Sequence, residues 1–456
     1  MGHERTRELT YRQTLVVVTL PFPENVPTGL GVIRALGQQG VPVIAAGARA
    51  NCLSMRSRYV SDVFVDDRLA YDGEAFAAAL RSLGARVSPK PVLFVSTDFQ
   101  AAAVSNAADA LRELYIYPYV EPERLTVALD KRRTCEVAKK AGISAPATVV
   151  AGPDSDVTAI IEEIRFSAVV RPAAWVEFEG GSVALHKVFR EVFSGKAVRA
   201  TDHRELERHL QTAADLATPI IVQEEIVGPS SRIFGASSYS DEDCDVRALF
   251  VGRKTRQLPS DFGSGTMVES MACEAVADHT KRLVEAAGYH GVAELEFKFD
   301  ERDQEFKIIE INPRPGTWIS VAPASGVNTP YVAYADLQGH SIPPVDQTGD
   351  GMKWIDAWPD LEYLYKYRSG DHAGERLSVG EYLRSVRGRR VWAYWDVRDP
   401  VPSLVRLGVV FRELSGRAIR KLVQPTSRKG AGGTFAGTRA GRLPALHSGV
   451  GDTERR

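Results

Sequence analysis

The sequence contains little cysteine, and its few cysteines lie far apart. Cys52, Cys135, Cys244 and Cys273 form no Cys-x-x-Cys pair. This spacing argues against a zinc site or a disulfide framework and predicts reduced thiols. Cys135 falls in a helical pattern and is interpreted as a structural residue.

Long apolar runs and an excess of one charge are also missing. The chain has no apolar stretch of about 18 residues, and residues 1–13 lack the apolar segment of a signal peptide. Its 57 basic residues nearly balance its 58 acidic residues, so nucleic acid is not expected as a main partner. We therefore expect a cytoplasmic protein without a signal peptide or membrane span.

Two common nucleotide-binding fingerprints are absent or incomplete. The sequence has no Gly-x-x-x-x-Gly-Lys-Ser/Thr pattern, which argues against a P-loop kinase. Gly29 and Gly31 follow an expected strand, but Arg34 stands where a dinucleotide fingerprint needs its third glycine, and no acid follows at the expected place. The pattern therefore disfavours a nicotinamide-dependent oxidoreductase.

The N-terminal third of the chain alternates between strand-like and helix-like patterns, which predicts an open α/β sheet. The expected elements are strands at 15–20, 41–46, 64–65 and 92–95, and helices at 30–39 and 74–83. Ser96, Thr97 and Asp98 follow the last of these strands. They either bind a ligand at the carboxyl end of the sheet or cap the next helix.

The most informative segment is a predicted β-hairpin near residue 300. Residues 294–299 and 306–311 alternate between polar and apolar side chains on either side of a charged turn at 300–304. This alternation is typical of two paired strands with one polar face.

Polar side chains of this hairpin form a candidate metal site. Glu296, Glu310 and Asn312 can project from one face, and their oxygen atoms suit Mg²⁺ held against phosphates. Arg314 adds a cation two residues further along. The alternative is a solvated acidic hairpin without a ligand, which an asparagine in an apolar strand disfavours.

The Glu-x-Asn-x-Arg run from Glu310 to Arg314 resembles the signature of ATP-grasp enzymes of the carboxylate-amine ligase type, which include D-aspartate and D-alanine-D-alanine ligases. The resemblance implies α/β and α+β architecture: an open α/β domain, a two-part ATP-grasp domain and a C-terminal extension. It also implies ATP and Mg²⁺, with Mn²⁺ as a substitute, and Glu296, Glu310 and Asn312 as metal ligands. Arg314 matches an arginine that contacts the reacting carboxylate or phosphoryl group.

The resemblance divides the chain into five parts. These are an N-terminal arm (1–13), the α/β domain that precedes the ATP-grasp core (14–120), the ATP-grasp domain (121–340, with a small lid subdomain at about 150–225), the extension (341–424) and a tail expected to be disordered (425–456).

Further segments fit the resemblance in the family's order. Asp130 is expected to cap a helix with Lys131 at its start, where a cation suggests a bound anion. Arg171 stands in place of a phosphate-binding lysine. The segment 179–187 resembles a glycine-rich phosphate lid, and 220–228 resembles the hinge that binds adenine. The implied ATP-binding residues are Lys131, Arg171, Gly180, Gly181, Ser182, Lys187, Gln223, Glu224, Glu225 and Ile226.

One family feature is missing from the hinge. Ser230 and Ser231 stand where many family members place an acid that binds the ribose. The sequence therefore does not identify the residue that contacts the ribose.

Residues 253–269 are rich in cations and glycine. This composition predicts a mobile loop that closes over phosphates and substrate, with Lys254 and Arg256 acting beside Arg314 as catalytic residues. A solvated hairpin end is the alternative.

Together these features predict an ATP-dependent ligase that activates a small carboxylate as an acyl phosphate, joins it to an amine, and releases ADP and phosphate. The alternatives are a nucleotide-binding protein with little or no ligase activity and an enzyme that transfers the acyl group to a thiol. The sequence identifies neither substrate and leaves a homo-oligomer open.

The C-terminal extension contains an amphipathic helical pattern. Its apolar stripe comprises Leu404, Leu407, Phe411, Leu414, Ala418 and Leu422. Such a stripe is expected to pack on the protein's own core, with an anionic membrane or an assembly partner as the alternative.

Overall fold

The computed structural model describes most of the chain. The described ranges are Leu9–Thr10, Val17–Thr19, 27–70, 73–152, 154–173, 189, 191–193, 195–215, 219–368 and 376–423. The chain divides into a large unit, Met1–Leu407, and a second unit, Gly408–Arg456. The predicted arm lies mostly outside the described ranges, and the predicted tail lies entirely outside them.

The N-terminal part of the large unit contains a four-stranded parallel sheet with the strand order β4-β3-β2-β6. Its strands are β2 (Val17–Thr19), β3 (Val43–Gly47), β4 (Val60–Val65) and β6 (Val92–Phe94). The helices around it are α1 (Pro27–Gly37), α2 (Gly73–Gly84), α3 (Asp98–Asn106) and α4 (Ala108–Leu111), with short 3-10 turns η1 (Leu53–Arg56) and η2 (Asp67–Ala70). Beside them, β1 (Leu9–Thr10) and β5 (Val87–Ser88) form a small parallel pair. The expected α/β sheet is confirmed.

Helix α1 begins earlier than the sequence predicts, so Gly29 and Gly31 lie within a helix and not in a loop. Packing explains the glycine at 31, because a Cβ there would lie 2.5 Å from Ile319 Cγ2. Gly37 is needed for a similar reason, since a Cβ there would lie 2.3 Å from Tyr59 Cβ. Gly31, which resembled part of a dinucleotide fingerprint, and Gly37 thus allow α1 to approach its neighbours closely.

A second, smaller sheet has the strand order β7-β10-β8-β9 and is antiparallel throughout. Its elements are β7 (Thr148–Ala151), α7 (Val157–Glu163), β8 (Ala168–Pro172), β9 (Val198–Ala200), α9 (His203–Asp215) and β10 (Ile220–Glu224). Ile160 of α7 and Leu206 of α9 pack against Ile220 and Val222 in one apolar cluster. This sheet falls within the region predicted as a lid subdomain.

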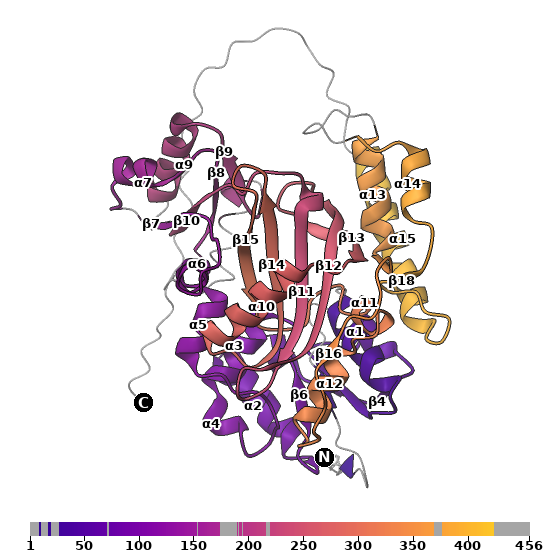
Figure 1. The fold of residues 1–456 in the computed structure, drawn as a ribbon. Helices are drawn as coiled ribbons and strands as arrows, with labels where there is room; N and C mark the ends of the chain where they lie inside the picture. Colours follow the sequence, from indigo (N-terminus) through magenta and orange to yellow (C-terminus); the bar gives the residue numbers. More distant parts are fainter. Residues whose placement is uncertain are drawn as a thin grey trace, which may run out of the picture. The chain divides into compact units, whose positions relative to one another are not determined.

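The large sheet lies at the centre of the large unit (Figure 1). Its strand order is β15-β14-β11-β12-β13-β17-β18, and β16 pairs with β12. Its strands are β11 (Ile233–Ser240), β12 (Val246–Leu258), β13 (Ser264–Ser270), β14 (Gly291–Asp300), β15 (Glu305–Asn312), β16 (Val345–Asp346), β17 (Lys353–Ile355) and β18 (Arg390–Trp392).

Both faces of this sheet are covered by helices. Alternation along β12 sends Leu249 and Val251 into one core cluster and Ala248 and Phe250 into another. The first cluster includes residues of α5 (Pro122–Leu129), α6 (Lys131–Lys140) and α10 (Glu274–Ala287), and the second includes residues of α1, α11 (Val321–Ala324) and α12 (Thr329–Asp336). The N-terminal sheet and the large sheet therefore share apolar core.

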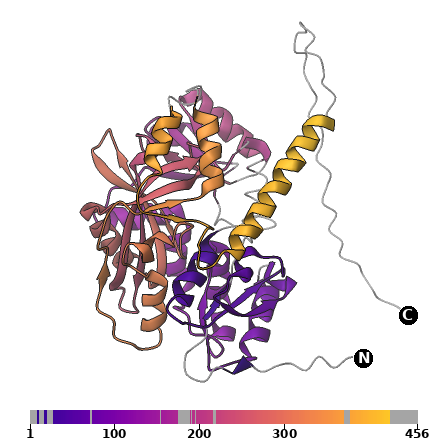
Figure 2. The same cartoon turned by 90° about the vertical axis from the view of Figure 1, so that its right-hand side faces the viewer.

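The extension adds strands and helices to the large sheet. Strand β17 pairs with β13, and β18 continues the sheet beyond it. The helices are α13 (Ala357–Tyr367), α14 (Val379–Ser385) and α15 (Val401–Val423), whose later part lies in the second unit. Figure 2 shows α13 and α14 side by side on the large unit.

The apolar stripe of α15 does not pack as predicted at its first two positions. Leu404 and Leu407 are 60% and 53% exposed. Within the described ranges, none of the helices is long and apolar enough to cross a bilayer.

Candidate active site

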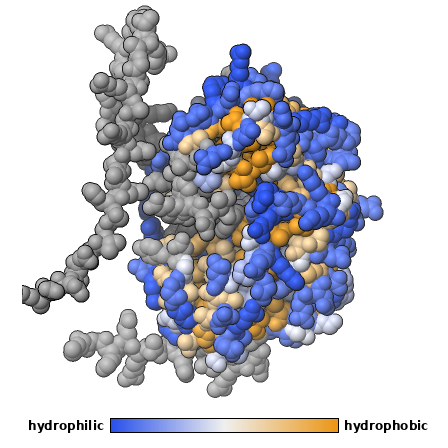
Figure 3. Space-filling view, turned by 90° about the vertical axis from the view of Figure 1, so that its left-hand side faces the viewer, coloured by the Kyte–Doolittle hydropathy of each residue, from blue (hydrophilic) through white to orange (hydrophobic). Residues whose placement is uncertain are grey.

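The candidate site is a cavity of about 860 Å³ in the large unit. Its walls come from β14 and β15, from the ends of β8 and β10, from the start of α6, from the β12–β13 hairpin and from Asp98 of α3. On the side of the molecule seen in Figure 3, the surface is mostly hydrophilic, with apolar side chains gathered in patches. The predicted site residues that line the cavity are Lys131, Arg171, Gln223, Glu224, Glu225, Ile226, Lys254, Glu296, Glu310, Asn312 and Arg314.

The predicted hairpin exists and aligns its acids across two strands. Glu296 of β14 lies opposite Glu310 of β15, and Glu294 lies opposite Asn312. The Asn312 Nδ2 group donates to Glu310 Oε1 at 3.3 Å and to the Glu294 carbonyl oxygen at 3.4 Å. The period-two pattern read from the sequence thus brings the three proposed metal ligands to one wall of the cavity.

Glu296 and Glu310 on this wall are each paired with a lysine from another element. Lys254 Nζ of β12 contacts both carboxylate oxygens of Glu296 at 2.6 Å. Lys131 Nζ donates to Glu310 Oε2. Lys131 is held at the first turn of α6 because Asp130 caps that helix, accepting hydrogen bonds from the Arg132 and Arg133 N–H groups.

These pairs and burial shift the pKa values of the site carboxyls in opposite directions. Burial alone would raise the pKa of Glu310, but the ammonium groups of Lys131 and Lys254 hold it well below its usual value. Burial and the neighbouring Glu296 carboxylate raise the pKa of Glu294 to about 8. Glu294 is only 3% exposed, and its Oε1 atom has no hydrogen-bond partner among the described residues.

Arg314 joins the N-terminal part of the chain to the hairpin. Its Nε lies 3.0 Å from Asp98 Oδ1, and its Nη1 lies 3.5 Å from Glu294 Oε2. Its Nη2 donates to Asn312 Oδ1 at 3.0 Å. The neighbouring Thr97 caps α3 through its side chain, so the capping interpretation holds for Thr97 while Asp98 reaches the cavity.

Arg171 of β8 lies on the opposite wall. Burial lowers the pKa of its guanidinium, and its Nε has no hydrogen-bond partner within the described part of the chain. A guanidinium whose Nε is buried without a partner is suited to bind an anion.

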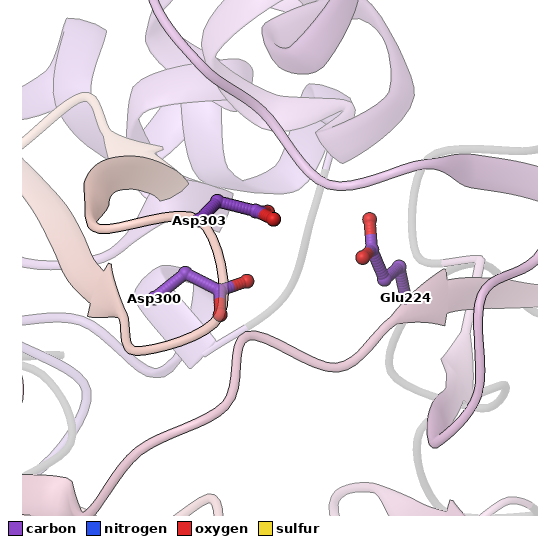
Figure 4. Close-up of side chains that lie close together, drawn as sticks. All are labelled: Glu224, Asp300 and Asp303. Carbon is purple, nitrogen blue, oxygen red and sulfur yellow. The ribbon is translucent and has the colours of Figure 1, made fainter.

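The hinge residue Glu224 belongs to a cluster of acids shown in Figure 4, together with Asp300 and Asp303. Cations from the same hairpin neutralise the cluster. Lys307 Nζ lies 2.9 Å from Asp300 Oδ2, and Arg302 Nη2 lies 3.0 Å from Glu224 Oε1. The cluster is therefore an ion-pair network that fixes the end of β10 against the turn between β14 and β15.

Four predicted ATP-binding residues cannot be placed. Gly180, Gly181, Ser182 and Lys187 lie outside the described residues. The expectation of a glycine-rich phosphate lid stays a prediction.

The prediction of a mobile loop at 253–269 is wrong for most of that segment. Its residues form the paired strands β12 and β13, joined by a short tip at 259–263. The polar residues at the start of this segment belong to β12, a long strand with one face toward the cavity. Cations followed by glycines indicated a loop, whereas the strand pairing of this segment depends on partners that the local composition does not reveal.

The expected catalytic position of Arg256 is also corrected. Arg256 is 4% exposed and lies against α13, not in the cavity wall as far as the described residues define it. The register shifts between Lys254 and Arg256, so Thr255 is an extra residue and Arg256 lies opposite Met267. A β-bulge of this kind reverses the side-chain alternation, and two residues that should share a face point to opposite sides.

Sequence reasoning missed several acids of the cavity wall. Glu294 belongs to the same alternation as Glu296 and could have been found by extending it one step. Glu301 also lines the cavity, next to Gly228 at the end of the hinge. It comes from the hairpin turn, so no linear motif connects it to the missing ribose acid.

Comparison with known proteins identifies the fold. The chain is 27% identical over 251 residues to a D-aspartate ligase of Enterococcus faecium, an alignment that covers 53% of this chain and 57% of the relative. It is 26% identical over 200 residues to a D-alanine–D-alanine ligase of Pseudomonas entomophila, covering 42% and 56% of the two chains. No family model matches the sequence.

Solved structures agree with these relatives. An L-amino acid ligase from Bacillus licheniformis superposes with a TM-score of 0.53 at 18% identity, covering 72% of this chain and 75% of the other. An N5-carboxyaminoimidazole synthetase from Staphylococcus aureus in complex with ADP gives 0.54 at 12% identity, covering 75% and 81%. The chain therefore has the ATP-grasp fold of these structures, and its sequence resembles those of carboxylate-amine ligases.

The ATP-grasp assignment agrees with the geometry of the cavity. The paired acids lie on the large sheet and the hinge on the small sheet, with the cavity between them. The alignments span little more than half the length of the curated relatives, so activity and substrates are treated below as proposals.

Proposed function

We propose that this protein is an ATP-dependent ligase that activates a carboxylate as an acyl phosphate and joins it to an amine, releasing ADP and phosphate. One observation carries the proposal: two carboxylate–lysine pairs, Glu296–Lys254 and Glu310–Lys131, face one cavity that also contains the hinge. The relatives that are amide-forming ligases support it.

The residues on the hairpin wall fit a divalent cation. Glu296, Glu310 and Asn312 offer hard oxygen donors from adjacent strands, which is the donor chemistry of Mg²⁺ and, with less selectivity, of Mn²⁺. These three residues would hold the metal. When bound, it would neutralise the charge of the ATP phosphates and of the reacting phosphoryl group.

The cations around the cavity would bind the phosphates of ATP. Arg171 has a free Nε donor on one wall, and Lys131 and Lys254 supply ammonium groups on the others. Gln223, Glu224, Glu225 and Ile226 line the cavity at the hinge and would contact adenine. Glu301 is our candidate for the ribose contact, because it lines the cavity and lies beside Gly228 at the end of the hinge.

In the proposed reaction, a carboxylate oxygen of the substrate attacks the γ-phosphorus of ATP, and the bond to the β–γ bridging oxygen breaks to release ADP. The amine nitrogen then attacks the acyl carbon, phosphate leaves, and the nitrogen loses a proton. Arg314 lies at the end of the cavity next to Asp98 and would orient the carboxylate. Because ATP is the co-substrate, we propose a cytoplasmic location.

The test is a screen of amino acids and other small carboxylates with ATP, Mg²⁺ and hydroxylamine as a surrogate amine. We expect a hydroxamate from at least one acid and ADP formation that depends on that acid. Release of AMP and pyrophosphate would indicate adenylate chemistry and contradict the proposal. Tight ATP binding without any hydroxamate would favour a nucleotide-binding protein instead.

A further inference from the structure

The extension holds the β12–β13 hairpin through a buried carboxylate. Asp360 of α13 is fully buried and binds Arg256 through two hydrogen bonds of 2.7 Å, from Nε to Oδ1 and from Nη2 to Oδ2. Thr266 Oγ1 of β13 donates to the same carboxylate at 2.9 Å. One side chain of α13 therefore binds both strands of the hairpin, and a two-point arginine contact fixes direction as well as distance.

The same helix also holds the tip of the hairpin. The Ser260 N–H group donates to Tyr367 Oη at 3.0 Å, and Gln257 Nε2 donates to the Ser260 carbonyl oxygen at 2.6 Å. The hairpin residues that line the cavity are Lys254, Gln257, Ser260, Asp261, Phe262, Gly263, Ser264 and Gly265. Helix α13 thus contacts, from behind, the segment that forms one cavity wall.

The bulge at Thr255 connects these contacts to the reaction site. It turns Arg256 toward α13, while Lys254 stays in the cavity wall and pairs with Glu296. Anchoring Arg256 therefore also sets the position of the lysine two residues before it.

We propose that Asp360 and Tyr367 are positioning residues, through which the extension holds the β12–β13 hairpin over the cavity and keeps water away from the activated carboxylate. The reaction part rests on the proposed function. An acyl phosphate that meets water loses its phosphate without forming an amide, so a displaced tip would let ATP be consumed without product.

The experiment uses the full chain and two variants of different severity. Asp360→Asn weakens the contact with Arg256, and Tyr367→Phe removes the hydroxyl that accepts from Ser260 N–H. The matched control is Asp399→Asn, because Asp399 is likewise fully buried and pairs with Arg34 Nε at 2.9 Å, but lies outside the described cavity wall.

Two readouts separate positioning from a general loss of stability. The first is amide hydrogen exchange at 257–265 in the ligand-free protein, where we expect about tenfold faster exchange in Asp360→Asn and Tyr367→Phe than in the control. The second is the ratio of ADP to hydroxamate formed, which should rise severalfold in the two α13 variants and remain unchanged in Asp399→Asn.

The outcomes are distinct. The proposal is overturned if folded Tyr367→Phe shows neither faster exchange at 257–265 nor a higher ratio of ADP to hydroxamate. It is also overturned if Asp399→Asn shows both of these changes. Faster exchange with an unchanged ratio would also overturn it, because the hairpin would be held without protecting the intermediate. If the unmodified protein forms no hydroxamate, the proposed function fails, while the exchange comparison still decides whether α13 holds the hairpin.

Discussion

Two sets of ion pairs in this protein differ in where they lie, and the difference indicates what each set is for. Lys131–Glu310 faces the cavity, with its side chains 22% and 29% exposed. Arg256–Asp360 is sealed behind the same sheet, at 5% and 0%. A pair beside a cavity can exchange its partner for a ligand, whereas a sealed pair that loses one member leaves a charge buried without compensation.

Changing a pair that faces the cavity should affect turnover and spare stability. We expect Glu310→Gln to lower kcat/KM by about a thousandfold, because the amide is nearly isosteric but lacks the charge that a divalent cation needs. Thermal unfolding should change little. The matched control is Glu305→Gln, on the same strand but exposed. This variant should keep both its kcat/KM and its thermal stability. A fully active, folded Glu310→Gln protein would sink the metal-site assignment.

Changing a sealed pair away from the cavity should lower stability and spare turnover. Asp399→Asn should cost about 3 kcal/mol of unfolding free energy, because the Arg34 guanidinium stays buried with a weaker partner. Urea titration measures the loss, and kcat should be unaffected at a temperature where the variant is folded. Replacing both residues by Met and Leu should recover most of the stability. If it does not, the loss comes from packing and not from the unpaired charge.

Arg314 tests the boundary between the two sets, because it faces the cavity but binds protein groups on several sides. We expect Arg314→Ala to keep ATP binding and to lower acid-dependent ADP formation by about a hundredfold, the usual cost of losing one donor to the reacting group. Calorimetry with ATP and the hydroxamate assay separate the two steps. Equal loss of binding and reaction would show that Arg314 serves the nucleotide and not the carboxylate.

The smallest effect is expected at Glu294, and it depends on pH. The folded protein holds the pKa of this carboxyl at about 8, against an ordinary value of 4.5. Between these values the folded state keeps a proton that the unfolded state has lost, so its contribution to stability falls as pH rises.

Glu294→Gln removes that titration and should stabilise the metal-free protein at pH 8 by at least about 1 kcal/mol, with little gain at pH 4.5. Unfolding by urea at the two pH values measures this difference. An equal change at both would mean that the substitution acts through packing against Gly316, whose missing side chain leaves room for the carboxylate.

Much of the fold and of the site could be predicted from the sequence because the signals were local. The alternation around 300–304 was enough to place Glu296, Glu310 and Asn312 on one face of a hairpin, since strand geometry repeats every two residues. The N-cap at Asp130 and the position of Lys131 also depend on a few neighbouring residues. The family resemblance then connected these segments in the correct order.

Other features depend on contacts between residues far apart in the chain. The glycines of α1 were needed for packing against Ile319 and Tyr59, partners that no local pattern reveals. Arg256 and Lys254 are two positions apart and would share a face in a regular strand, but a single extra residue in β12 sends one to the cavity and the other to α13. This arrangement is favourable because the buried carboxylate of Asp360 binds the Arg256 side chain. Asp360 lies 104 positions after Arg256 in the chain, so no local pattern reveals the pairing.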